Sequence, residues 1–82
     1  MPIQQLRNSH LKTSVMVHIE ELLDDYHRKV IESIMKRMDG VTHAHFNETQ
    51  HHLMIVGYDP KRTDADTILM RVRRQHLHAQ VI

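Results

Sequence analysis

The sequence predicts an α+β sandwich in which two helices cover one face of a four-stranded antiparallel sheet. Apolar residues recur at every second position in four short stretches, as they do in strands, and at intervals of three and four in two longer stretches, as they do in helices. These stretches follow one another in the order β-α-β-β-α-β. A chain of 82 residues has room for a single domain of this kind.

The first element is a strand. Residues 1–13 show no sustained periodicity, and we expect them to form a loose lead-in to a domain at 14–82. Apolar and polar residues alternate over 14–20, which predicts a strand that is buried on one side. The side expected to face the helices carries Val15, Val17 and Ile19.

A helix is predicted between Asp24 and Gly40, because an apolar stripe recurs there with helical spacing while most charged residues lie outside it. Asp24 or Asp25 can cap its N-terminus, and Gly40 suits the position just after its C-terminus. The stripe consists of Leu23, His27, Val30, Ile31, Ile34 and Met38.

Residues 41–60 predict a β-hairpin, because two strand-like stretches flank a polar centre at 47–50. In the first strand the apolar residues share one face and the histidines the other. In the second strand both faces are apolar, and we assign Leu53 and Ile55 to the core. The open face of the sheet is then expected to carry Met16, His18, His43, His45, Met54, Val56 and His78.

The last third of the chain predicts a turn, a helix and a short strand. Thr63 and Asp66 resemble a capping box, and a second apolar stripe runs from Ala65 to Val72. Residues 76–82 then form the last strand. Because strand-to-strand crossovers are right-handed, this order of elements predicts the ferredoxin-like βαββαβ sandwich.

The composition excludes several classes of function. A net charge of +1 and only three aromatic residues argue against a nucleic-acid-binding protein. No apolar stretch approaches the roughly 20 residues of a membrane span, so we expect a cytosolic protein without membrane contact. The chain has no cysteine nucleophile, and its two glycines are too few for a glycine-rich phosphate-binding loop. We therefore expect that the protein is not an enzyme. Nine histidines remain as the unusual feature.

Several short motifs occur along the chain in a specific order. They are DGV at 39–41, FN at 46–47, YDP at 58–60 and ILMRV at 68–72, together with Ala44 and Ala79. In this order the chain resembles the heavy-metal-associated domain, the βαββαβ module of copper chaperones and of the N-termini of P-type metal-ATPases. The resemblance covers about residues 15–82 and implies the same fold and a role in metal binding.

The chain departs from this family at the metal position. The family binds metal through a GMxCxxC motif in the first strand-to-helix loop, and here Leu22 stands at the methionine position. Asp24 replaces the first cysteine and His27 the second, so thiolate binding of Cu(I) is lost. The family's glycine after the second helix is replaced by His76. The resemblance therefore implies an Asp-x-x-His metal position.

The predicted topology places three loops at the same end of the sandwich as this position. That end carries Asp24, His27, His51, His52 and His76. Three or four oxygen and nitrogen ligands suit zinc, at about 2.0–2.2 Å, or copper(II), with nickel and cobalt as further candidates. The first hypothesis is thus a metallochaperone-like protein that binds a divalent transition-metal ion through Asp and His.

Each of these residues also has a structural alternative. Asp24 suits a helix cap, His27 can pack on the apolar stripe, and His76 suits the negative end of a helix. His51 and His52 can be ordinary polar residues near a hairpin tip. The second hypothesis is therefore a metal-free module for protein–protein interaction, or for homodimerisation through the open face of the sheet.

Overall fold

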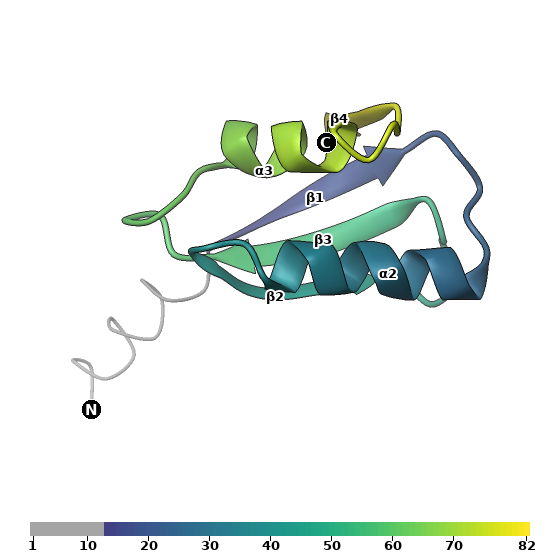
Figure 1. Cartoon of the computed structure of the whole chain (residues 1–82), viewed down its shortest axis with the longest axis horizontal. Coiled ribbons are helices and arrows are strands. Elements are labelled where there is room, and N and C mark those ends of the chain that lie inside the picture. Colours follow the sequence, from purple (N-terminus) through teal and green to yellow (C-terminus); the bar gives the residue numbers. More distant parts are fainter. Residues whose placement is uncertain (1–12) are drawn as a thin grey trace.

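The protein forms an open four-stranded antiparallel sheet with two helices on one side, which confirms the predicted ferredoxin-like fold (Figure 1). The computed structural model describes residues 13–82, so the lead-in predicted for 1–13 lies, apart from its last residue, outside the described residues. The strand order is β2-β3-β1-β4, with antiparallel pairing at each step. The elements are β1 (Ser14–Ile19), α2 (Asp25–Lys36), β2 (Val41–Phe46), β3 (Leu53–Tyr58), α3 (Ala65–Arg73) and β4 (Ala79–Val81).

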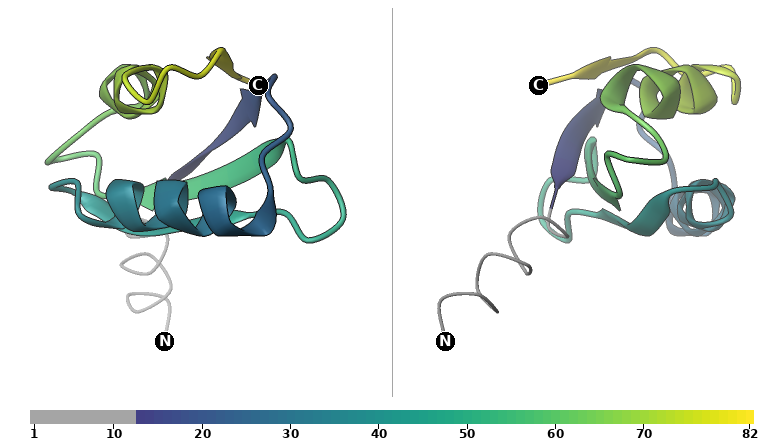
Figure 2. Two further views of the ribbon diagram at one scale, coloured as in Figure 1. Left: turned by 45° about the vertical axis from the view of Figure 1, so that its right-hand side comes forward. Right: turned by 90° about the vertical axis from the view of Figure 1, so that its left-hand side faces the viewer.

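The core lies between the two helices and the sheet face that they cover (Figure 2). Met35 of α2 and both Ile68 and Val72 of α3 are completely buried there. The strands contribute alternate residues, as expected for a sheet with one covered face. These buried strand residues are Val15, Val17, Ile19, Ala44, Phe46, Met54, Val56 and Ala79.

The assignment of the β3 faces from the sequence is wrong. Met54 and Val56 are fully buried, whereas Ile55 is 37% exposed on the open face. The register explains this, because Met54 is paired with Val17 and Phe46, and side chains of directly paired residues lie on the same face. Both faces of β3 are apolar, so alternation alone did not distinguish them. The open face therefore carries Leu53 and Ile55.

The helix boundaries differ from the prediction in two places. The predicted cap Asp24 is confirmed, since its side chain accepts from the N–H of the third residue after it. Gly40 has a φ of 89° but lies beyond the end of α2 at Lys36, so it belongs to the turn before β2. The cap of α3 is Asp64 rather than Thr63. Neither described helix is long and apolar enough to cross a membrane.

Candidate functional site

Three loops meet at one end of the sheet, as the topology predicts (Figure 1). The Ile19 N–H donates to the His52 carbonyl at 2.8 Å, which joins the end of β1 to the hairpin loop. The Glu20 N–H donates to the His78 carbonyl at 2.8 Å, which joins the same segment to the α3–β4 loop. Main-chain hydrogen bonds therefore build the end of the molecule at which a metal position is expected.

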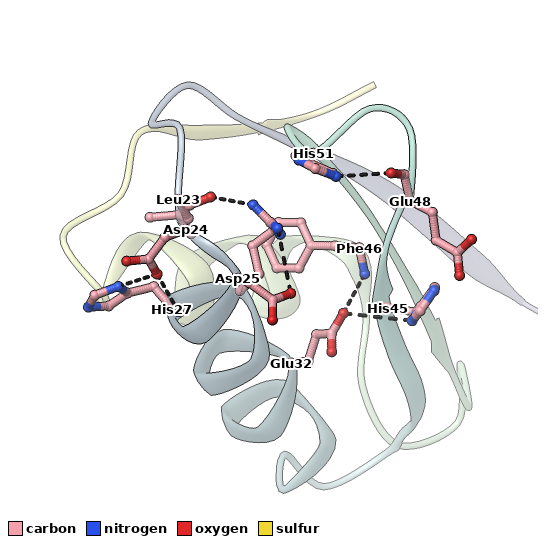
Figure 3. Close-up of polar contacts among 10 residues, drawn as sticks. Leu23, Asp24, Asp25, His27, Glu32, His45, Phe46, Glu48 and His51 are labelled. Atoms are coloured by element: carbon pink, nitrogen blue, oxygen red, sulfur yellow. Dashed lines mark hydrogen bonds and ion pairs between the residues drawn. The ribbon is translucent and has the colours of Figure 1, made fainter.

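Two of the predicted ligands, Asp24 and His27, are in direct contact. The Asp24 Oδ1 atom accepts a hydrogen bond from the His27 N–H at 2.8 Å and another from His27 Nδ1 at 2.6 Å (Figure 3). The side chains are 66% and 62% exposed respectively, so His27 does not pack on the apolar stripe. The pair lies on the surface, at the first turn of α2.

The electrostatics of this pair leave one imidazole nitrogen available. Hydrogen bonds from the main chain and then the ring of His27 lower the pKa of Asp24, which is therefore a carboxylate at neutral pH. A carboxylate only accepts, so His27 Nδ1 carries the proton, and the neutral ring keeps its lone pair on Nε2. Carboxylates orient ligating histidines in this way in many metal sites. The arrangement can present one nitrogen ligand, Nε2, on the side of the ring away from the carboxylate, so that Asp24 orients the imidazole while Nε2 faces the ion.

The other predicted ligands engage in separate hydrogen bonds. His51 Nε2 is 2.9 Å from the Glu48 carbonyl, and His52 Nδ1 is 2.7 Å from the Ile19 carbonyl. His76 is exposed and has a φ of 64°, in the left-handed region. Within residues 13–82, no three His, Asp or Glu side chains gather closely enough to hold a metal ion. The structure thus brings together one pair of the five.

His78 occupies a position that the sequence did not indicate. It was expected on the open face, but it precedes β4 and pairs with Glu21 of the β1–α2 loop, with Nδ1 to Oε2 at 2.7 Å. Its main-chain N–H also donates to the same carboxylate. The side-chain hydrogen bond from His78, followed by the main-chain one, lowers the pKa of Glu21, and the pKa of His78 is raised in return. The two loops are therefore joined by a charge-assisted contact.

Glu32 of α2 also has a role that periodicity did not reveal. Its Oε2 atom accepts a hydrogen bond from the Phe46 N–H at 2.7 Å and lies 3.7 Å from His45 Nδ1 (Figure 3). Because β2 is an edge strand, this carboxylate satisfies a main-chain donor that would otherwise face outward. Glu32 thus attaches the helix to the edge of the sheet.

The open face combines apolar residues with histidines. Met16 is 36% exposed and is paired with Ile55, which in turn is paired with His45. The His43 ring lies over Gly57, where an added Cβ would be 2.1 Å from the ring. This face therefore has an apolar centre with imidazoles along its border.

The structure is similar to solved structures of copper-binding proteins. A copper-binding domain from HMA7, a P-type ATPase, matches with a TM-score of 0.76 and 16% identity, over 84% of this chain and 92% of that one. The yeast copper transporter domain Ccc2a gives a TM-score of 0.73 and 16% identity, over 84% and 93%. The copper chaperone of Enterococcus hirae gives a TM-score of 0.74 and 18% identity, over 83% and 98%. No protein-family model and no curated protein matches the sequence.

These similarities show that the chain has the fold of heavy-metal-associated domains, as the sequence resemblance implied. The order of strands and helices and the three loops at one end belong to this fold. The chain contains no cysteine, so the CxxC motif of that family is lacking. Any metal chemistry at the first strand-to-helix loop must therefore use oxygen and nitrogen ligands.

Proposed function

We propose that the protein is a small metallochaperone-like protein that binds a divalent transition-metal ion at Asp24 and His27. The observation that carries the proposal is the contact between the Asp24 carboxylate and His27 Nδ1, which leaves Nε2 free at an exposed surface. The pair spans the N-cap and the first turn of α2, where copper-binding proteins of the same fold have their cysteines by the resemblance described above. Imidazole and carboxylate ligands favour Zn²⁺ or Cu²⁺, and also Ni²⁺ or Co²⁺, over Cu(I).

The proposed site is incomplete by itself. In this proposal His51, His52 and His76 are the candidates for further ligands, since they lie on the other loops of the same end. They form no three-ligand group with the pair within the described residues, so water or a partner must complete the coordination sphere. A structural zinc site has four protein ligands, whereas an open site exchanges its ion readily. Weak, reversible binding suits a carrier, and we propose no catalytic activity, a cytosolic location and no membrane or nucleic-acid partner.

Calorimetric titration of the untagged protein with Zn²⁺ and Cu²⁺ tests the proposal. We expect His27→Ala to weaken divalent-ion binding at this site at least tenfold, whereas His43→Ala, a histidine on the open face, should leave it unchanged. Asp24→Asn retains a good helix cap but removes the charge that orients the imidazole, so it should weaken binding without unfolding α2. If His27→Ala and Asp24→Asn both bind as the wild type does, the proposal is wrong.

A second function is favoured by a different observation. Met16, Leu53 and Ile55 form an apolar area on the sheet face that the helices leave uncovered. We propose as the alternative that this face is a protein–protein interaction surface, with a second copy of the chain as its partner. This alternative requires no metal ion.

A further inference from the structure

A second pair of histidines lies at the edge of the open face. The His18 side chain leaves β1 on that face, and His52 comes from the hairpin loop just before β3. Their ring centroids are 5.7 Å apart, and the ring planes differ by 23°. Two imidazoles far apart in the sequence are therefore held side by side.

Main-chain contacts fix the orientation of His52. Its carbonyl accepts from the Ile19 N–H at 2.8 Å, and its Nδ1 is 2.7 Å from the Ile19 carbonyl. A carbonyl oxygen only accepts, so Nδ1 carries a proton, and the neutral ring has its lone pair on Nε2. His52 thus has one nitrogen used for anchoring and one available as a ligand.

His18 contains a polar atom without a partner. Its Nδ1 atom is enclosed and forms no hydrogen bond within residues 13–82. Because solvent does not reach this atom, neither a water nor an ion fits beside it, and a metal ion can bind His18 only through Nε2.

We propose that His18 and His52 bind one divalent transition-metal ion between them, at a site distinct from Asp24 and His27. Two imidazoles that share a zinc ion, with nitrogens about 2.0–2.1 Å from it, have ring centres about 5–5.5 Å apart at tetrahedral to trigonal angles. The observed separation of 5.7 Å lies slightly above this range, so binding requires the His18 ring to move toward His52, whose orientation is fixed. Nitrogen ligands select Zn²⁺, Cu²⁺, Ni²⁺ or Co²⁺ over Mg²⁺ and Ca²⁺, which prefer oxygen.

The surroundings leave space for the rest of the coordination sphere. The two rings line a shallow hollow of about 470 Å³ that His51, Leu22 and Leu53 also border. Since no third His, Asp or Glu joins the pair within the described part of the chain, water supplies the remaining ligands. The ion is therefore accessible and exchangeable. This inference does not depend on the Asp24–His27 proposal, and it assigns His52 to the second site, so that only His51 and His76 remain as further candidates for the first.

NMR titration of the full-length, untagged chain with zinc chloride tests the inference, with magnesium chloride as the control ion. We expect Zn²⁺ but not Mg²⁺ to shift the imidazole signals of His18 and His52. His18→Ala and His52→Ala should each weaken the apparent affinity at this site at least tenfold. His45→Ala removes another imidazole from the open face and should have no effect.

The outcomes separate this site from the first one. His27→Ala should leave the zinc-induced shifts of His18 and His52 unchanged, while it removes those near α2. Because His52 lies in a loop, His52→Ala should keep the dispersed amide spectrum of the folded protein and so tests the site even if His18→Ala disturbs β1. Wild-type affinity in a folded His52→Ala protein, or zinc-induced shifts confined to the neighbourhood of His27, would overturn the inference.

Discussion

Replacing Met54 or its neighbour Ile55 by alanine tests which face of β3 belongs to the core. Met54 is fully buried, so its truncation removes apolar contacts and leaves a cavity, whereas Ile55 is 37% exposed and its truncation leaves space that water can fill. We expect Met54→Ala to lower the free energy of unfolding by about 3 kcal/mol, within the usual range for buried Met→Ala changes. We expect about 1 kcal/mol for Ile55→Ala, because part of that side chain is already in water.

The difference is large relative to the stability of so small a domain. A protein of this length has a total stability of about 4–12 kcal/mol, and a loss of 3 kcal/mol corresponds to a fall in Tm of about 12–24 °C. Urea unfolding followed by circular dichroism, together with thermal scans of both variants, measures the effect. An Ile55→Ala protein that is as unstable as Met54→Ala, or less stable, would refute the assignment of the faces and the reading of the strand register.

Two further predictions concern the loops and the open face. In the wild type the pKa of His78 should exceed its usual 6.5, because the Glu21 carboxylate accepts its hydrogen bond, and Glu21→Gln should return it toward that value in an NMR titration. Since the pKa of His78 is raised and that of Glu21 is lowered from 4.5, their contact should stabilise the fold most between about pH 4.5 and 6.5. The stabilisation should decline as pH rises through the raised pKa of His78, and as pH falls through the lowered pKa of Glu21. A His78 pKa in the wild type that is not raised would contradict this prediction. If the open face is a dimer interface, sedimentation at neutral pH should show concentration-dependent association that Ile55→Glu abolishes, and a strict monomer at high concentration would exclude it.

The sequence was sufficient to predict the order and type of the elements. Apolar residues that recur with a period of two or of three to four distinguish strands from helices without any knowledge of the partner elements. The cap at Asp24 was equally predictable, because capping depends on a side chain and an N–H three residues away. The same local spacing brings Asp24 and His27 together. Properties determined by near neighbours in the chain are therefore readable from the sequence.

The burial of Met54 was decided only by the tertiary structure. Met54 and Ile55 are both apolar and differ in burial because the register pairs Met54 with Val17 and Phe46. A shift of one residue would exchange the two faces, and no residue within β3 itself reports which register is adopted. The predicted α3 cap and the predicted role of Gly40 at the end of α2 were wrong by only a few positions along the chain. Several residues that favour caps and turns follow one another there, so the sequence does not distinguish among them.

The contacts between distant residues were likewise invisible in the sequence. His18 meets His52, and His78 meets Glu21, only because the sheet and the loop hydrogen bonds bring separate segments to one end. The sequence determined by itself that histidines, and not cysteines, are available as metal ligands. Which histidines become neighbours depends on strand register and loop path, because these set the distances between side chains that are far apart along the chain.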